Sequence, residues 1–314
     1  MKTVGIIGLG YWGEKYIRIT NELQSVKLKG ICDINDDILE KFKKIVADDV
    51  KIYNKAEDLI EDPEIHYIII VTIASTHYNL IKTGILNNKE ILVEKPYTTN
   101  LKQAIEITNL LNKKNKNILI GHTYLFNNKI SWIKTHLENN FQQVDTITFE
   151  WYNSGPIRND TNEIYDLAVH CISILFYIYG TECYQTINAI RNDNGTTFII
   201  IKLKNNIIVN INVSWNTPGK TRKITFSNSY NKLVYDDINN THPIKIYFKN
   251  SPIHNDNMGY LYNDGHVLMP QIGNIEPLKY QFYCWINNHY IDSNQDFGIK
   301  VMKILNEINL KISN

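Results

Sequence analysis

The sequence has few cysteines, no long apolar run and no excess of charge of either sign. Its four cysteines lie far apart, at positions 32, 171, 183 and 284, with no CxxC. This spacing argues against a disulfide-rich secreted scaffold and indicates buried thiols in a reducing, cytoplasmic compartment. No apolar stretch approaches the ~20 residues of a membrane-spanning helix. The formal net charge of +1 gives no basis for binding nucleic acid or a membrane surface.

Metal-binding and targeting signals are also missing. The nine histidines form no HxxxH or HExxH pair, so we predict no metal site. The N-terminal MKTVGIIGLGYW has a lysine before an apolar run, but glycines interrupt the run and no small-residue cleavage site follows, so we expect no secretory leader. The composition is that of an ordinary globular protein, and 314 residues are enough for two domains.

The first 121 residues alternate between short apolar runs and helical patterns. Continuous β-branched runs are typical of strands buried on both faces, and strict alternation favours a doubly wound parallel sheet. We therefore predict an α/β Rossmann domain over residues 1–121. Its strands are expected at 3–8, 26–33, 51–53, 66–72, 90–96 and 117–123, and its helices at 13–22, 36–47, 77–87 and 101–114.

Residues 122–314 have a different pattern, typical of an α+β domain with an open-faced, mostly antiparallel sheet. Its C-terminal helix is expected to pack back on the first domain. Strands are predicted at 144–152, 183–190, 196–203, 206–215, 222–227, 232–236 and 244–248, helices at 130–139, 163–179, 277–289 and 297–311, and a long loop at 250–275.

The segment GLGYWG, with Gly8, Gly10 and Gly13, lies between the first strand and the first helix. In this context the glycines allow a tight turn, approach of a pyrophosphate and close helix–strand packing. Asp33 ends the second strand 20 residues after Gly13 and can accept hydrogen bonds from a ribose. No Arg or Lys follows it directly, so NAD is favoured over NADP. The alternative is a glycine turn in a nucleotide-free domain.

Polar residues follow the fourth and fifth strands, at the sheet edge where open α/β sheets bind ligands. Lys95 follows Glu94 and precedes Pro96, which restricts it to an extended conformation and allows a cis peptide bond. It is either aimed at the crevice or a salt-bridged surface residue. Thr72, Ser75 and His77 end the fourth strand, and His77 either caps its helix or approaches the nicotinamide ribose. The residues expected at the cofactor are Gly8, Gly10, Tyr11, Trp12, Gly13, Asp33, Thr72, Ser75, His77 and Glu94.

The segment EIYDLAVHCISI places Asp166 and His170 four residues apart in an apolar helical run. At α-helical pitch the two side chains share a face. The pair is either a core histidine satisfied by an acid or a proton-transfer pair. A histidine suits the second task, because its ordinary pKa of about 6.5 lies near neutrality.

In order and spacing, the segments GLGYWG, CDIN, STHYNL, VEKP, IGHTYLF, YDLAVHCISI and EPLKYQFYCWI resemble the Gfo/Idh/MocA oxidoreductases. These are NAD(P)-dependent dehydrogenases of sugars, inositols and sugar nucleotides with a Rossmann domain followed by an open-faced sheet. The resemblance implies that Lys95, Asp166 and His170 are catalytic. His170 would take the hydroxyl proton, Asp166 would orient the imidazole or contact substrate, and Lys95 would hydrogen-bond the reacting oxygen or itself be the base.

The resemblance further implies a sugar or nucleotide-activated sugar as substrate, as in UDP-N-acetylhexosamine 3-dehydrogenases. Alternatives are an inositol or free-sugar dehydrogenase, a ketoreductase, or a non-catalytic NAD-sensing regulator. Cys171 stands where similar members usually have Asp, which either weakens a substrate contact or is a packing exchange. The substrate-binding residues expected are Lys95, Tyr124, Arg158, Asn162 and His170, with Trp151 as a further stacking candidate.

The open sheet predicts an assembly. Its exposed face is expected to be a large apolar surface covered by another subunit, in a homodimer or homotetramer.

Overall fold

The computed structural model describes residues 1–314 apart from 142, 251–252, 256–258, 262–264, 290–292 and 313–314. Contacts within it divide the chain into two compact units. The first unit comprises Met1–Phe126, Asn159–Thr161 and Glu276–Asn306, and the second Asn127–Arg158, Asn162–Ile275 and Glu307–Asn314. The first break thus follows Phe126, five residues after the predicted end of the Rossmann domain, and the chain returns to the first unit near its C-terminus.

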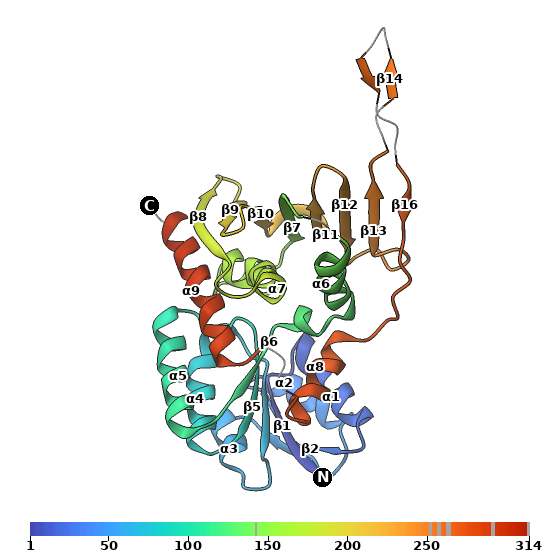
Figure 1. Cartoon of the computed structure of the whole chain (residues 1–314). Helices are drawn as coiled ribbons and strands as arrows, with labels where there is room; N and C mark the ends of the chain where they lie inside the picture. The colour runs from blue at the N-terminus through green and yellow to red at the C-terminus, as the bar shows by residue number, and fades with distance from the viewer. Residues whose placement is uncertain (142, 251–252, 256–258, 262–264, 290–292, 313–314) are drawn as a thin grey trace. The chain divides into compact units, whose positions relative to one another are not determined.

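The first unit is a doubly wound α/β domain, as predicted (Figure 1). Its parallel strands lie in the order β3-β2-β1-β4-β5-β6, the arrangement of dinucleotide-binding folds. The strands are β1 (Lys2–Ile7), β2 (Val26–Cys32), β3 (Lys51–Tyr53), β4 (Tyr67–Ile70), β5 (Glu90–Glu94) and β6 (Ile118–Gly121). The helices are α1 (Tyr11–Glu22), α2 (Asp36–Lys43), α3 (Ala56–Glu61), α4 (Ala74–Leu86) and α5 (Leu101–Lys114), followed by the 3₁₀ helix η1 (Thr123–Phe126).

The core of this sheet explains its parallel topology. The apolar residues of β4, β5 and β6 are buried on both faces, because helices cover each side. Helices α3, α4 and α5 pack against one another along the chain. Helix α1 packs instead with α8 (Pro277–Ile286), where Phe282 lies edge-on to Tyr16 at 6.4 Å. Helix α8 therefore completes the first unit, whereas α9 (Gln295–Ile312), further on, belongs partly to each unit.

The second unit contains an eight-stranded sheet in the order β16-β13-β12-β11-β7-β10-β9-β8. All of its pairings are antiparallel except that of β7 with β10, which confirms the predicted fold class. The strands are β7 (Thr146–Ser154), β8 (Tyr184–Arg191), β9 (Thr197–Leu203), β10 (Ile208–Ser214), β11 (Asn216–Ser227), β12 (Asn231–Asp236), β13 (Ile244–Phe248) and β16 (Val267–Leu268). The helices are α6 (Asn128–Asn140), the π-helix η2 (Ile164–Ala168) and α7 (Val169–Tyr179); α9 (Gln295–Ile312) contributes residues to both units.

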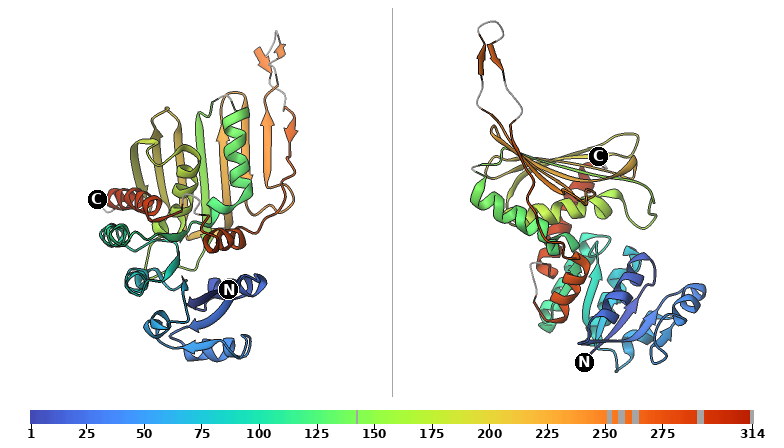
Figure 2. Two further views of the ribbon diagram at one scale, coloured as in Figure 1. Left: turned by 60° about the horizontal axis from the view of Figure 1, so that its bottom comes forward. Right: turned by 90° about the vertical axis from the view of Figure 1, so that its right-hand side faces the viewer.

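Helices α6 and α7 lie on one face of this sheet and leave the other face open (Figure 2). The open face differs from its prediction as an apolar surface. Strand register places Glu150 between Asn212 and Lys223, and similarly places Thr148 between polar neighbours. Exposed apolar side chains lie at the edges of the sheet instead, with Ile190 on β8 70% exposed and Val267 on β16 40% exposed. The prediction was wrong for the centre of the sheet, because alternation puts Thr, Asn and charged residues there. An assembly through this face remains a prediction, without a continuous apolar surface to drive it.

The predicted loop at 250–275 contains short strands. β16 pairs with β13, and β14 (Ile253–Asn255) pairs with β15 (Gly259–Leu261). The remainder of that prediction, at residues 251–252, 256–258 and 262–264, lies outside the described residues.

Candidate active site

The glycine-rich loop joins β1 to α1 and has a geometry that requires glycine at two positions. Gly8 has a φ of +96°, and a Cβ there would lie 2.8 Å from the carbonyl oxygen of Val71. A Cβ on Gly13 would lie 2.1 Å from the carbonyl oxygen of Gly8. At Gly10, no atom of the described residues lies within 4 Å of the Cβ position. The loop is therefore tight at its ends and open in the middle, which fits approach of a pyrophosphate at the start of α1.

Asp33 follows β2 and holds this loop in place. Its Oδ2 accepts a hydrogen bond from the backbone N–H of Leu9 at 2.7 Å, and its Oδ1 accepts one from Asn35 at 3.0 Å. Each carboxylate oxygen has further acceptor capacity, which a ribose hydroxyl can use. The structure thus gives Asp33 a loop-orienting role in addition to the predicted contact with ribose.

Two exposed aromatic side chains stand in the first turn of α1. Tyr11 is 72% exposed and Trp12 39% exposed, and their rings form a T-shaped pair with centroids 5.4 Å apart. The ammonium group of Lys15 lies 4.6 Å from the centroid of the Tyr11 ring. This pair provides apolar surface beside the open glycine loop, which a planar ligand can cover.

The residues after β4 occupy different environments. Ser75 is exposed, and the hydroxyl of Thr72 lies 2.6 Å from that of Thr76. His77 is 1% exposed, and its Nδ1 lies 2.9 Å from the carbonyl oxygen of Pro96. Because α4 begins at Ala74, His77 lies within the helix and does not cap it. It connects the helix to the segment after β5, and its ring is directed into the protein rather than at a ribose.

Lys95 is half-buried directly after β5, and its peptide bond to Pro96 is cis, one of the two forms that the sequence allows. The side chain of Glu94 fixes the backbone of Lys95. The Glu94 Oε2 accepts a hydrogen bond from the Lys95 backbone N–H at 3.3 Å, and Oε1 accepts one from the Tyr16 hydroxyl at 2.9 Å. Gln281 donates to the same hydroxyl at 2.8 Å. Burial raises the pKa of Glu94, and burial with the nearby Glu94 carboxylate raises that of Tyr16. The predicted cofactor residue Glu94 thus turns its side chain inward.

His122, after β6, is a residue that sequence reasoning did not assign. It is 1% exposed, and neither ring nitrogen has a hydrogen-bond partner among the described residues. Burial, with the charge of Lys95 as a second cause, lowers the pKa of His122 from 6.5 to about 3. A neutral imidazole therefore lies near the Lys95 ammonium. The only sequence signal is a histidine that ends an apolar strand.

The helix with Asp166 and His170 differs from the predicted regular α-helix. Residues Ile164–Ala168 form a π-helix, and the N–H of Val169 bonds to the carbonyl of Ile164. Asp166 thus lies in the π-helix, whereas His170 lies in the first turn of α7, which begins at Val169. A spacing of four residues is close to one full turn in either kind of helix. Such π-segments are frequent at functional sites.

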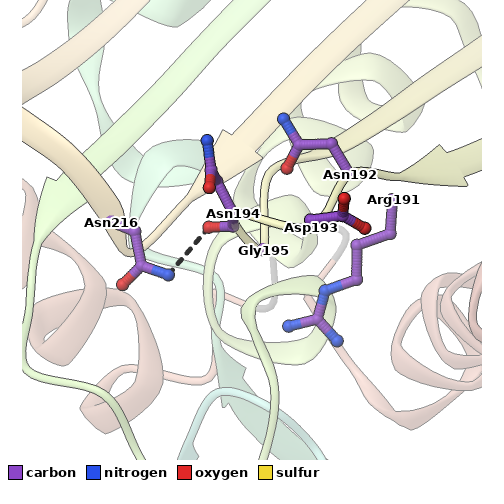
Figure 3. Close-up of a pocket in the computed structure, with 6 residues that line it drawn as sticks. All are labelled: Arg191, Asn192, Asp193, Asn194, Gly195 and Asn216. Atoms are coloured by element: carbon purple, nitrogen blue, oxygen red, sulfur yellow. Dashed lines mark hydrogen bonds between the residues drawn. The ribbon is translucent and has the colours of Figure 1, made fainter.

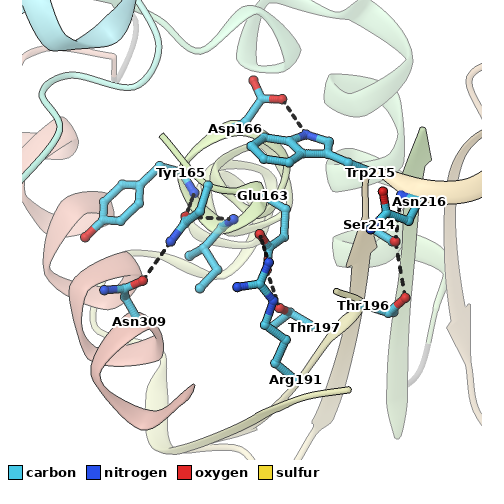
Figure 4. Close-up of polar contacts among 12 residues, drawn as sticks. Glu163, Tyr165, Asp166, Arg191, Thr196, Thr197, Ser214, Trp215, Asn216 and Asn309 are labelled. Carbon is cyan, nitrogen blue, oxygen red and sulfur yellow. Dashed lines mark hydrogen bonds and ion pairs between the residues drawn. The ribbon is translucent and has the colours of Figure 1, made fainter. Parts of the chain in front are cut away.

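Two side chains hold Asp166: Trp215, from a distant segment of the chain (Figure 4), and Arg158, eight residues before it. The indole N–H of Trp215 donates to Oδ2 at 2.9 Å, and the guanidinium of Arg158 lies 3.4 Å from Oδ1. Asp166 is 9% exposed and Trp215 7% exposed. Arg158, predicted for substrate, is thus positioned at Asp166. Trp215 was missed, because it follows β10 in the chain and only the fold brings it to the helix.

The start of the helix is held by two further residues. The Oδ1 of Asn162 accepts from the backbone N–H groups of Ile164 and Tyr165 at 3.2 Å, and its Nδ2 donates to Asn309 at 2.8 Å. Both ends of the amide are engaged, so Asn162 caps the helix instead of facing substrate as predicted. Glu163, 1% exposed, accepts from Thr197 at 2.6 Å and pairs with Arg191 at 3.1 Å (Figure 4).

His170 is half-buried beside the core of the second unit. The ring of Trp151 lies 6.4 Å from the His170 ring, and the guanidinium of Arg222 lies 5.3 Å from the Trp151 ring. Trp151 is fully buried, which excludes the suggested stacking on substrate. Cys171 is fully buried too, and burial raises the pKa of its thiol. Of the two explanations for Cys171, the structure favours a packing exchange.

The remaining predicted residues lie on different units. Lys95 and half-buried Tyr124 belong to the first unit, whereas Arg158, Asp166 and His170 belong to the second.

In the part of the chain that the structure describes, no cluster of His, Cys, Asp or Glu could hold a metal ion. Within the same part, no helix combines the length and apolarity that crossing a membrane requires.

Comparisons with known proteins agree with the glycine-loop geometry. Residues 2–122 match the family described as GFO_IDH_MocA, an oxidoreductase family with an NAD-binding Rossmann fold. This match identifies the first domain as an NAD-binding Rossmann fold similar to that of the family.

Curated relatives include two enzymes of inositol. The chain is 26% identical over 184 residues to an inositol 2-dehydrogenase/D-chiro-inositol 3-dehydrogenase of Lacticaseibacillus casei, covering 57% of this chain and 53% of that one. It is 25% identical over 185 residues to a myo-inositol 2-dehydrogenase of Thermotoga maritima, covering 57% and 55%. The chain thus spans about half the length of the curated relatives it matches.

Solved structures share the fold over the whole chain. A UDP-N-acetylglucosamine 3-dehydrogenase of Acidithiobacillus ferrooxidans superposes with a TM-score of 0.78 at 17% identity, covering 99% of this chain and 97% of that one. An oxidoreductase of unassigned activity from Magnetospirillum magnetotacticum superposes with a TM-score of 0.81 at 22% identity, covering 97% and 98%. At these identities the likeness establishes the fold alone.

Proposed function

We propose that the protein is an NAD-dependent dehydrogenase of a secondary ring hydroxyl, with a nucleotide-activated sugar as its first candidate substrate. The observation that carries the proposal is the held carboxylate of Asp166 on a π-helix, with His170 four residues further on. A buried core pair would not require two dedicated donors, one of them brought from a distant segment. The open glycine loop and Asp33 support a dinucleotide with a free ribose 2′-hydroxyl.

Each residue has a part in this reaction. When bound, the nicotinamide cofactor supplies the hydride acceptor. His170 accepts the proton of the substrate hydroxyl as general base. Lys95 donates a hydrogen bond to the same oxygen and favours its developing negative charge, with its backbone held by Glu94. The Asp166 carboxylate is held by Trp215 and Arg158, and it stabilises the imidazolium that forms at His170.

The site allows alternative roles for some of these residues. Lys95 can act as base if His170 orients substrate, and Tyr124 can contact the sugar from η1. The cofactor residues proposed are those of the glycine loop with Tyr11, Trp12, Asp33, Thr72 and Ser75. A cytoplasmic homodimer or homotetramer through the second sheet is part of the same proposal.

A second candidate is an inositol dehydrogenase, favoured by the sequence similarity to two such enzymes. It uses the same chemistry, because an inositol carries a secondary ring hydroxyl. An inositol differs from a nucleotide-activated sugar because it carries no group beyond the ring.

The test is NADH formation by purified protein with NAD and a panel of UDP- and dTDP-hexoses, inositols and free sugars. Wild type is compared with Lys95→Ala, His170→Ala and the control Lys204→Ala at an exposed turn. We expect turnover with one substrate class, a loss of about 10²-fold to 10⁴-fold in the first two variants, and no change in the control. Turnover with inositols alone would select the second candidate. Absence of turnover with NAD binding intact would contradict a dehydrogenase and favour an NAD-sensing regulator.

A further inference from the structure

A polar pocket of about 500 Å³ lies at the turn between β8 and β9 (Figure 3). Six residues line it: Arg191, Asn192, Asp193, Asn194, Gly195 and Asn216. The turn is well defined, since Gly195 and Asn192 are joined by a backbone hydrogen bond of 3.0 Å and the Asn192 side chain accepts from Thr196 at 2.8 Å. The pocket therefore presents fixed polar groups rather than a variable surface.

Gly195 gives the pocket its depth. Its φ is +74°, and a Cβ there would lie 3.1 Å from the Nδ2 of Asn216 and 3.6 Å from a guanidinium nitrogen of Arg191. Two hydrogen-bond donors thus converge on the space that glycine leaves open. Asn216 also donates to the carbonyl oxygen of Asn194 at 2.9 Å, which fixes the orientation of its amide (Figure 3).

The pocket connects to the Asp166 helix in two ways (Figure 4). Arg191 pairs with the buried carboxylate of Glu163, which lies three residues before Asp166. Asn216 follows Trp215, the donor to Asp166, so their Cα atoms are about 3.8 Å apart. A group bound in the pocket would therefore lie next to the residues that hold Asp166.

Charge in the pocket selects against anions. The guanidinium of Arg191 is balanced by Glu163, and Asp193 then leaves one net negative charge among these three residues. The remaining polar side chains are neutral amides, which both donate and accept. Hydroxyl groups have the same double capacity, whereas a phosphate only accepts at neutral pH and would be repelled by Asp193.

We propose that this pocket is a specificity subsite for a neutral, hydroxyl-bearing ring of the substrate, remote from the hydroxyl that is oxidised. The proposal deepens the dehydrogenase assignment and rests on it for the identity of the ligand as substrate. Two sources share this chemistry: the nucleoside of a sugar nucleotide, whose diphosphate would lie outside the pocket, and a second glycosyl unit. An inositol would leave the pocket empty.

Binding of four probes tests the subsite without turnover. Full-length protein saturated with NAD is titrated with uridine, uridine 5′-monophosphate, methyl glucoside and glucose 6-phosphate, followed by ligand-observed NMR. We expect at least one neutral probe to bind more tightly than its phosphorylated counterpart. Tighter binding of uridine identifies a nucleoside and tighter binding of methyl glucoside a glycosyl unit.

Variants locate the probe. Asn216→Ala removes a donor and should raise the Kd of the neutral probe by about threefold to tenfold. Asp193→Asn removes the charge that repels phosphate. It should therefore reduce the difference in Kd between the neutral and the phosphorylated probes. The control Asn188→Ala changes an exposed amide on β8, the strand that leads to the pocket. Because Asn188 does not line the pocket, every Kd should stay unchanged.

Two results would overturn the subsite: tighter binding of the phosphorylated probes to wild type, or an unchanged Kd in Asn216→Ala. Neither depends on catalysis. If the panel shows no NADH formation but a neutral probe binds through Asn216, the pocket stands and the dehydrogenase assignment fails. If turnover occurs and the probes do not bind, the reverse holds.

Discussion

The glycine loop and the Asp166 helix are built by different means. The loop depends on backbone geometry within about 30 residues: the φ of Gly8, the close contact at Gly13 and the hydrogen bond from Leu9 to Asp33. The helix depends on side chains that arrive from β8, β9 and the end of β10, at Arg191, Thr197 and Trp215. A site built from local backbone can be inferred from spacing, whereas a site built from distant side chains requires the fold.

His122 also belongs to the first unit, but it contributes through a buried side chain and not through the backbone. The pH dependence of unfolding that it causes is the largest effect expected. The lowered pKa means that the folded state binds fewer protons than the unfolded state between about pH 6.5 and 3. Stability is present above pH 6.5 and falls as pH decreases, by about 1.4 kcal/mol per pH unit. At pH 4 the loss from His122 alone should be about 3 kcal/mol.

Urea unfolding of wild type and His122→Phe from pH 7 to 4 measures this loss. Phenylalanine has a similar size and no titrating nitrogen, so the two stability curves should diverge as the pH falls. Parallel curves would show that His122 has a partner in solution and that the first region contains no uncompensated side chain.

The glycine loop can be tested by a pair of alanine substitutions. Gly13→Ala places a methyl group against the Gly8 carbonyl oxygen, where only backbone movement can relieve the contact. We expect about 2–3 kcal/mol of destabilisation and loss of NAD binding. In Gly10→Ala, the methyl enters open space, so stability should change by less than about 0.5 kcal/mol while NAD affinity falls. Equal destabilisation of the two variants would contradict the geometry.

The buried carboxylate of Glu163 tests the side-chain region. Thr197→Val keeps the shape and removes the hydroxyl that donates to Glu163 at 2.6 Å. Loss of a hydrogen bond to a buried charge should cost about 2 kcal/mol in thermal or urea unfolding. The matched control Thr148→Val, on the open face of the same sheet, should change stability by less than about 0.5 kcal/mol.

Trp215→Phe isolates the donor to Asp166. The aromatic packing remains and the N–H is lost, so kcat should fall about tenfold, which corresponds to about 1.4 kcal/mol. NAD affinity should be unchanged, because Trp215 lies on the second unit. The pH profile of kcat should move as well, since the carboxylate that stabilises the imidazolium is less well oriented. An unchanged pH profile would reduce Trp215 to a packing residue.

The fold was largely predictable, and the site only in part. Apolar runs of the right length and the GLGYWG spacing predicted both sheets, because burial and backbone geometry are local properties of the sequence. The π-helix at Ile164–Ala168 was not predictable, since a π-helix has the same composition as an α-helix. The capping role of Asn162 was not predicted, because capping and ligand binding use the same amide. The open sheet face was misjudged until strand register located Glu150 and its neighbours.

Transfer of a deuteride tests the central claim most directly. Once the panel has identified a substrate, its carbon-deuterated form is mixed with stoichiometric enzyme and NAD in a single turnover, and the mass of the reduced cofactor is measured. We predict that wild type forms NADH carrying one deuterium and that His170→Ala binds NAD normally but transfers about 10²-fold more slowly. Equal rates in the two proteins would contradict the assignment of Asp166 and His170 to proton transfer.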